Sequence, residues 1–310
     1  MNPNDLKSTN PLGLLAAHGQ SVWLDYIRRS LLTSGELQRM IDQDGLRGVT
    51  SNPAIFEKAI AGGTEYAEVL AADDAGANAK SRYERLAIRD IQDAADILRP
   101  LYTRTSYRDG YVSLEVSPYL ARDTESTLEE ARRLWAAVDR PNVMIKVPAT
   151  PEGIPAIRAL IADGINVNIT LLFSQAAYEA VAEAYIAGLE ALATRGGDLS
   201  RVASVASFFI SRIDTAIDAQ IAPHKIKCKA FAEHIAKIQR QTPRQGLQIQ
   251  DPEQFGRARV SFQKTPIGKM HLQFTIHARV IRRADGALPR HLALQRTLGF
   301  GQNARLPQAV

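Results

Sequence analysis

The stretch NVMIKVPATPEGIPAIRALIADGINVNITLLF, residues 142–173, predicts one β-α-β unit of a parallel sheet. Its two ends, 142–149 and 164–173, are apolar at most positions, which is typical of strands buried on both faces. A longer helical pattern lies between them, as the connection between parallel strands requires. The same alternation recurs along the chain, and this repetition decides the fold class.

Four more apolar runs, at 21–27, 47–52, 110–117 and 201–209, alternate with helical patterns. Six β-then-α units predict a parallel α/β fold. No glycine-rich phosphate loop follows the first strand, which argues against a dinucleotide-binding Rossmann fold. We predict a (β/α)8 barrel of the TIM type, in which an atypical C-terminal tail replaces or disrupts the last two βα units.

Cap residues predict where several helices begin. The predicted starts are the capping-box pairs Thr33–Glu36 and Ser126–Glu129, and the single cap residues Asn52, Thr150 and Ser174. An additional long helix is predicted over about 82–104, before the third strand.

The tail differs from the rest of the chain in charge. Residues 221–310 carry 16 Lys and Arg against 4 Asp and Glu, whereas residues 1–220 carry 22 against 29. The net charge of +5 therefore comes from the tail, and it does not indicate nucleic-acid binding by the whole protein. Within the tail, 260–267 and 270–281 alternate polar and apolar residues, as half-exposed antiparallel strands do.

We therefore divide the chain into a catalytic β/α-barrel domain of six βα units, 1–222, and an atypical basic tail, 223–310. Our hypothesis is that the tail is read out of frame. A barrel without its last two strands is expected to have two open sheet edges and low stability.

The chain starts with MNPNDLKSTN, which has no apolar signal-peptide region, and no run of about 18 apolar residues predicts a membrane span. Cys228 is the only cysteine, so no internal disulfide can form, which suits a reducing compartment. We expect a cytoplasmic protein with neither a membrane nor a nucleic-acid partner, and we leave open whether it forms a homo-oligomer.

Lys146 is the most informative single residue, because it interrupts the apolar run VMIKVP. A buried ammonium group is costly unless it is paired or loses its proton. Burial lowers the pKa of a lysine, and a neutral amine can attack a carbonyl to form a Schiff base. The alternative is a lysine that extends from a strand end to solvent.

Two carboxylates interrupt other strands. Glu115, in YVSLEVS, fits a general acid or base, or a structural ion pair with Lys146 on the next strand. Asp25, in VWLDYI, fits an acid in the site or a cap to the following loop.

Polar residues without charge form a third group. Asn168 and Thr170 share one strand face, where they fit substrate contacts or a satisfied polar layer inside a barrel. The second strand ends on three more candidates, Thr50, Ser51 and Asn52, although Asn52 also fits a helix cap.

Ser207 and Arg212 follow the sixth strand, where an arginine can bind a phosphate in a bidentate manner. A surface arginine at a helix start is the alternative. Candidates thus occur on six successive strands, and a barrel brings such positions together at one mouth.

Five long motifs resemble those of the transaldolase family: GVTSNPAIFEKAI, VSLEVSP, VMIKVPAT, GINVNITLLFS and VASVASFFISRID. The resemblance covers about residues 11–220 and is greatest to the branch found in cyanobacteria and actinobacteria. Beyond it, the Trp-Ala-Ser-Thr strand expected of the family is missing from the sequence.

The resemblance implies transfer of a dihydroxyacetone unit between sugar phosphates in the non-oxidative pentose phosphate pathway, without metal or organic cofactor. It also implies roles for individual residues: Lys146 as the Schiff-base lysine, Glu115 and Thr170 around a catalytic water, Asp25 as the acid in carbon–carbon cleavage, Asn52 and Asn168 at the dihydroxyacetone hydroxyls and the carbinolamine, and Ser207 and Arg212 at substrate and phosphate. Thr50 and Ser51 are further candidates for substrate binding.

Other functions remain open on the sequence alone. A simple class I aldolase would use the same lysine but release the cleaved unit. A truncated or frameshifted member of the family would be inactive. A non-catalytic chain would bind a polyanion through the basic tail, although its basic residues form no recognition motif.

Overall fold

The computed structural model describes residues 10–17, 19–67, 70, 78–221, 258–264 and 270–276. The chain divides into two compact units, one of residues 1–214 and 256–279 and the other of residues 215–255 and 280–310. The first unit contains the barrel and the candidate site. The boundary predicted between a barrel domain, 1–222, and a tail, 223–310, stays a prediction.

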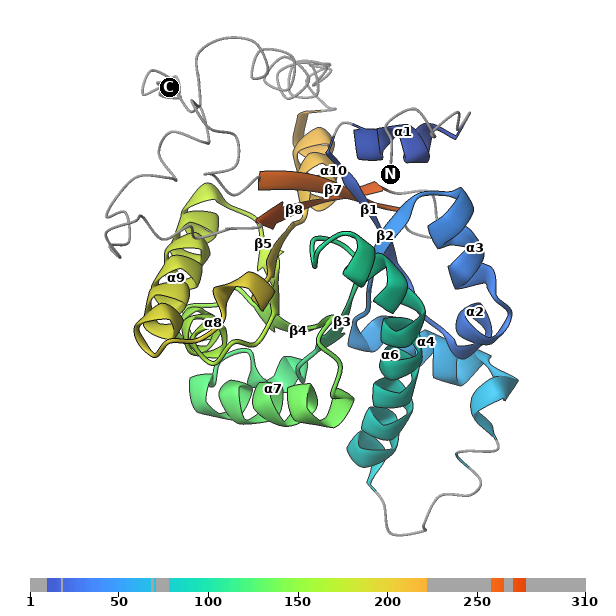
Figure 1. Cartoon of the computed structure of the whole chain (residues 1–310), viewed down its shortest axis with the longest axis horizontal. Coiled ribbons are helices and arrows are strands. Elements are labelled where there is room, and N and C mark those ends of the chain that lie inside the picture. The colour runs from blue at the N-terminus through green and yellow to red at the C-terminus, as the bar shows by residue number, and fades with distance from the viewer. Residues whose placement is uncertain are drawn as a thin grey trace. The chain divides into compact units, whose positions relative to one another are not determined.

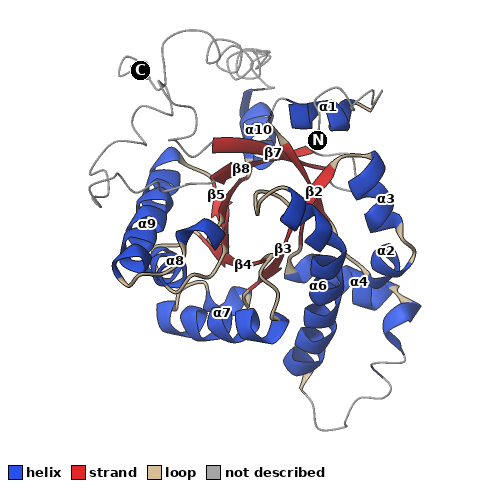
Figure 2. Cartoon of the chain, viewed as in Figure 1, coloured by secondary structure: helices blue, strands red, loops and turns tan. Residues whose placement is uncertain are grey.

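The six predicted parallel strands are confirmed, and each pairs with the next along the chain. They form the ring in the centre of Figure 1 and are drawn in red in Figure 2. Their bounds are β1 (Ser21–Asp25), β2 (Leu46–Thr50), β3 (Tyr111–Glu115), β4 (Val143–Pro148), β5 (Val167–Leu172) and β6 (Ser204–Phe208).

A hairpin closes the ring in place of two further βα units. Strands β7 (Ala258–Lys264) and β8 (Met270–Ile276) pair with each other in antiparallel fashion, as the alternating tail segments predict. Strand β7 runs parallel to β1, and β8 runs antiparallel to β6. The predicted barrel with an atypical end is confirmed, but the expectation of two open edges is wrong because the hairpin pairs with both edges. The remaining parts of the predicted tail strands, 265–267 and 277–281, lie outside the described residues.

Helices surround the ring, shown in blue in Figure 2. They are α1 (Pro11–Ala17), α2 (Arg29–Thr33), α3 (Glu36–Gln43), α4 (Pro53–Gly62), α6 (Ala79–Arg104), α7 (Thr124–Val138), α8 (Gly153–Ala162), α9 (Gln175–Thr194) and α10 (Ile210–Ile221). Single 3₁₀ turns cover Thr64–Tyr66, Pro118–Leu120 and Leu199–Arg201. The long helix predicted over 82–104 is α6.

Two of the single-residue caps are confirmed: Asn52 caps α4 and Ser174 caps α9 through their side-chain oxygens. The third is wrong, because α8 begins at Gly153 and its cap residue is Glu152, although Thr150 Oγ1 accepts from the backbone of Gly153. The capping boxes are wrong. Helix α3 begins after Gly35, whose φ of 80° lies in the left-handed region that glycine adopts without strain. Helix α7 begins one turn earlier than predicted, because the side chain of Asp123 accepts from the backbone of Ser126.

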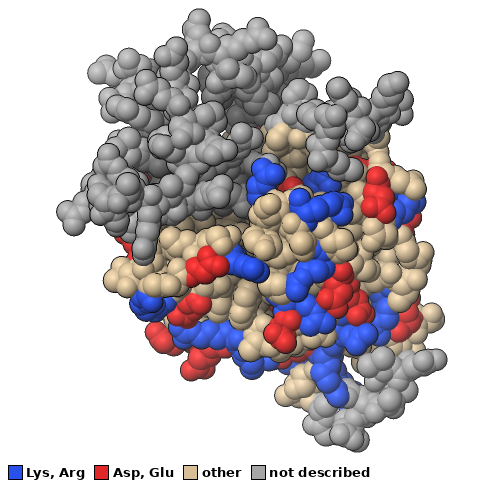
Figure 3. All heavy atoms as spheres, in the orientation of Figure 1, with Lys and Arg blue, Asp and Glu red and all other residues tan. Residues whose placement is uncertain are grey.

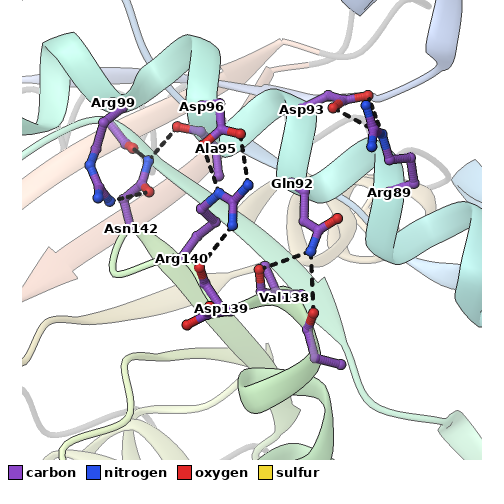
Figure 4. Close-up of polar contacts among 12 residues, drawn as sticks. Arg89, Gln92, Asp93, Ala95, Asp96, Arg99, Val138, Asp139, Arg140 and Asn142 are labelled. Atoms are coloured by element: carbon purple, nitrogen blue, oxygen red, sulfur yellow. Dashed lines mark hydrogen bonds and ion pairs between the residues drawn. The ribbon is translucent and has the colours of Figure 1, made fainter.

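The ends of the strands remote from the candidate site are tied together by two buried asparagines. Asn142, just before β4, donates from Nδ2 to the carbonyl oxygens of Ala95 and Gly110, at 2.8 Å each. Figure 4 shows Asn142 beside Ala95 of α6, with the Arg140–Asp96 ion pair next to them. Asn166, just before β5, donates from Nδ2 to the carbonyl oxygens of Pro141 and Val143, and its Oδ1 accepts from the backbone of Ala203. These side chains fix β4, β5 and β6 relative to one another.

Large apolar side chains fill the barrel below the candidate site. Trp23, Tyr111, Met144 and Val205 form a buried cluster together with Tyr102 and Ala203. Gly48 of β2 makes room for this cluster, because a Cβ there would lie 2.3 Å from the indole of Trp23. The interior is therefore a packed core that ends where the polar residues begin.

We predict that Gly48→Ala destabilises the protein by about 1–3 kcal/mol, since the added methyl group overpacks the core against Trp23. The control is Gly62→Ala at the end of α4, where no described atom lies within 4 Å of the added Cβ. Urea denaturation of both variants measures the difference, and equal midpoints would contradict the packing argument.

Candidate active site

Lys146 is buried inside the barrel, with 6% of its surface exposed. Its Nζ lies 3.3 Å from Oε2 of Glu115 and donates to the carbonyl oxygen of Ser51 at 3.2 Å. The ion pair follows from the sheet, because Glu115 and Lys146 are direct partners in the register of β3 and β4. The structure thus places the ammonium group between a carboxylate and a carbonyl and not at the surface.

Burial raises the pKa of the Glu115 carboxyl group above its ordinary value. The positive charge of Lys146 lowers this pKa in part, and the negative charge of Asp25 raises it. The carboxyl group therefore keeps its proton to a higher pH than an exposed glutamate does. A carboxyl group shifted in this direction beside an amine suits proton transfer near neutral pH.

Four more polar side chains join the lysine through a chain of hydrogen bonds. Ser51 Oγ donates to the carbonyl oxygen of Ser113 at 2.7 Å. Asn168 Nδ2 donates to Ser113 Oγ at 2.9 Å, and Ser207 Oγ donates to Asn168 Oδ1 at 2.7 Å. The structure thus brings Ser51, Asn168 and Ser207 together.

Sequence reasoning missed Ser113, although a signal for it exists. In YVSLEVS it lies two residues before Glu115, so both side chains point to the same face of the strand. Ser113 is a polar residue in a mostly apolar strand, which is the same signal that identified Asn168 and Thr170.

The other candidates lie on the same strands. Thr50 is buried, pairs in register with Asp25 and Ser113, and its Oγ1 has no hydrogen-bond partner among the described residues. Asp25 ends β1 and is half-buried, and its charge acts on the carboxyl group of Glu115. Thr170 is buried two residues beyond Asn168. A β-bulge follows it, with Leu171 at a φ of 61°, in the left-handed region.

Asn52 and Arg212 stand apart from the hydrogen-bonded chain. Asn52 Oδ1 accepts from the backbone of Ile55 at 3.0 Å, which supports its role as a helix cap. Arg212, in the first turn of α10, is exposed, and its guanidinium group lies 4.5 Å from the centre of the Phe209 ring. Phe209 in turn stacks on Phe173. In the described part of the chain, no ion pair or side-chain hydrogen bond joins Arg212 to the other candidates.

A cavity of about 620 Å³ lies beside the end of β3. Pro53, Tyr83, Tyr119 and Glu130 line it together with Glu115. Its walls come from α4, α6 and α7, so Glu115 borders both the hydrogen-bonded chain and this cavity. A carboxyl group placed between the two can exchange protons with solvent in the cavity.

The described residues hold neither a metal-binding cluster nor a membrane-spanning helix. No cluster of three or more His, Cys, Asp or Glu side chains suited to a metal ion occurs among them. None of the described helices is long and apolar enough to span a membrane.

The sequence of this chain is similar to those of one known family. The sequence model of the family described as "Transaldolase/Fructose-6-phosphate aldolase" matches residues 22–265, which extends past the resemblance expected to end near residue 220. A transaldolase of Trichodesmium erythraeum is 53% identical over 214 residues, 69% of this chain and 56% of that protein. Those of Thiobacillus denitrificans and Thermobifida fusca are 55% and 51% identical, over 66% and 69% of this chain and 57% and 58% of their own lengths.

The chain therefore spans less than three-fifths of the length of these curated relatives. The relatives include both cyanobacterial and actinobacterial proteins, as the motifs predict. With the family match across most of its barrel, this chain belongs to the transaldolase/fructose-6-phosphate aldolase family.

Proposed function

We propose that this chain is a transaldolase that forms a Schiff base at Lys146. It would transfer a dihydroxyacetone unit from sedoheptulose 7-phosphate to glyceraldehyde 3-phosphate, giving erythrose 4-phosphate and fructose 6-phosphate. The observation that carries the proposal is the buried Lys146 Nζ, held between the Glu115 carboxylate and the Ser51 carbonyl. A lysine side chain beside a group that can accept its proton can attack a carbonyl carbon to form a Schiff base.

In the proposed reaction, Lys146 Nζ attacks the C2 carbonyl of the ketose phosphate and forms a carbinolamine, which loses water to give an iminium ion. Asp25 takes the proton of the C4 hydroxyl, the C3–C4 bond breaks, and its electron pair enters the iminium to form an enamine. The aldose phosphate leaves. The enamine carbon then attacks the aldehyde of the acceptor, and the acceptor oxygen takes the proton back from Asp25. Water adds to the iminium ion formed in this step, and the carbinolamine breaks down to release the ketose phosphate product and free Lys146.

The remaining side chains support these steps. Glu115 and Thr170 would hold the water that is lost and later returned, because the Glu115 carboxyl group borders Lys146. Asn168, Ser207 and Asn52 would bind the hydroxyl groups of the dihydroxyacetone unit, with Thr50 and Ser51 as further contacts. Arg212 would bind the substrate phosphate, and its exposed guanidinium group is available for this.

The proposed setting is the non-oxidative pentose phosphate pathway in the cytoplasm. The transaldolase names of the relatives support the pathway, and the single cysteine, Cys228, is compatible with the compartment. Basic and acidic side chains are interspersed on the described face in Figure 3. The basic residues of the alternative polyanion-binding tail fall mostly outside the described residues.

Fructose-6-phosphate aldolase activity is a second candidate, because the description of the matched family includes it. An aldolase would release free dihydroxyacetone from fructose 6-phosphate without an acceptor. A transaldolase would keep the unit on Lys146 until erythrose 4-phosphate is added. Assays of free dihydroxyacetone with and without erythrose 4-phosphate separate the two activities.

We predict that incubation with fructose 6-phosphate followed by borohydride attaches a reduced dihydroxyacetone unit to Lys146. Intact mass and peptide mapping locate the adduct. Lys146→Met is expected to abolish labelling, whereas Lys58→Met, on the exposed surface of α4, is expected to leave it unchanged. A folded wild-type protein without adduct would instead support an inactive member of the family.

We predict an acid limb in the pH profile of kcat/KM that lies above about pH 4.3, the ordinary value for a glutamate. The reaction needs the Glu115 carboxylate as a proton acceptor, and burial raises the pKa at which this form is lost as the pH falls. Glu115→Gln is expected to remove the limb and to lower kcat by about 10²–10⁴-fold.

Glu129→Gln is the matched control, because Glu129 is exposed on α7. It is expected to keep both the limb and the rate. An unchanged acid limb in Glu115→Gln would assign the titration to another group.

A further inference from the structure

Ser113 of β3 lies at the centre of the hydrogen-bonded chain described above. On one side, its carbonyl oxygen accepts from Ser51, and the carbonyl oxygen of Ser51 accepts from Lys146 Nζ. On the other side, its hydroxyl oxygen accepts from Asn168, and Asn168 accepts from Ser207. Ser113 therefore contacts both parts of the site, through its backbone carbonyl on the side of the lysine and through its hydroxyl on the side of the amide.

The hydrogen bond from Asn168 to the Ser113 hydroxyl helps to fix the position of the Asn168 side chain. A carboxamide has an oxygen end that accepts and a nitrogen end that donates. The Ser207 hydroxyl donates to the oxygen end and the Ser113 hydroxyl accepts from the nitrogen end. Because Asn168 and Ser113 are both fully buried, an amide displaced from Ser113 would lose a buried hydrogen bond.

The position of this side chain matters because Asn168 is the direct strand partner of Lys146, in the register of β4 and β5. A group that binds a hydroxyl next to the reacting amine must lie in one position for the carbonyl carbon to meet Nζ. Ser113 lies one strand away from the lysine, on the far side of β4 from β5. It reaches Asn168 across the interior of the barrel.

We propose that Ser113 is a positioning residue for the Schiff-base reaction, which holds the Asn168 side chain in one position relative to Lys146. The inference rests on the proposed function, and it assigns a role to a residue that the family motifs alone do not single out. Ser113 acts through Asn168, so the effect of losing its hydroxyl must depend on the presence of the Asn168 side chain.

The test is a double-mutant cycle in the full chain with Ser113→Ala, Asn168→Ala and the combination. Ser113→Ala is expected to lower kcat about 10–100-fold, as expected for a misplaced substrate contact. Borohydride trapping at Lys146 should persist, because the contacts of Nζ with Glu115 and Ser51 remain. The double variant should be no slower than Asn168→Ala alone.

Ser204→Ala is the matched control. Ser204 of β6 is also a buried serine of the barrel, but its hydroxyl donates to the carbonyl of Val167 at 3.0 Å. Ser204→Ala is expected to keep kcat within about twofold of the wild type. Combined with Asn168→Ala, its effect on kcat should be independent of that variant's effect. The positioning role is wrong if Ser113→Ala keeps kcat within about twofold, as Ser204→Ala does. It is also wrong if the fold-losses in kcat of Ser113→Ala and Asn168→Ala multiply in the double variant.

Failure of the proposed function gives a different result. A folded wild-type protein that forms no adduct and transfers nothing contradicts the proposed function. The free energies of unfolding of the same variants, measured by urea denaturation, then test the hydrogen bond between Asn168 and Ser113. Non-additive stabilities of Ser113→Ala and Asn168→Ala support the contact, and additive stabilities overturn the inference.

Discussion

The ammonium group of Lys146 is held inside a barrel, where a charge without compensation costs more than most folds can tolerate. The structure meets this constraint with the carboxylate of Glu115 and the carbonyl of Ser51. Both partners depend on the register of the neighbouring strands, because a shift by one residue would turn Glu115 to the other face. Asn142 and Asn166 hold that register from the opposite ends of the strands, far from the chemistry.

Part of this arrangement could be read from the sequence, for a physical reason. Strands buried on both faces need apolar residues at nearly every position, so Lys146 and Glu115 are conspicuous as exceptions within VMIKVP and VSLEV. Their mutual contact follows once the strands are known to be neighbours. The caps at Asn52 and Ser174 are local hydrogen bonds between a side chain and its own helix, which is why short motifs identify them.

Other features depend on contacts that no local pattern specifies. Alternation in the tail predicts two strands, but it does not say which edges of the barrel they meet. Ser113 is a small side chain that many buried strands accommodate, and its importance comes only from the amide that reaches it from β5. Arg212 has a long side chain whose position depends on the packing of its own helix turn, where it covers the ring of Phe209.

The hairpin that closes the barrel also sets the order in which the protein can assemble during synthesis. Strand β1 ends at residue 25, but the strand that pairs with its outer edge begins only at residue 258. At a translation rate of about 5–20 residues per second, roughly 10–50 s separate the emergence of these two strands from the ribosome. For that time the growing sheet carries an unpaired edge, and such an edge can pair with another chain. The nascent protein is therefore most exposed to aggregation before its own C-terminal hairpin arrives.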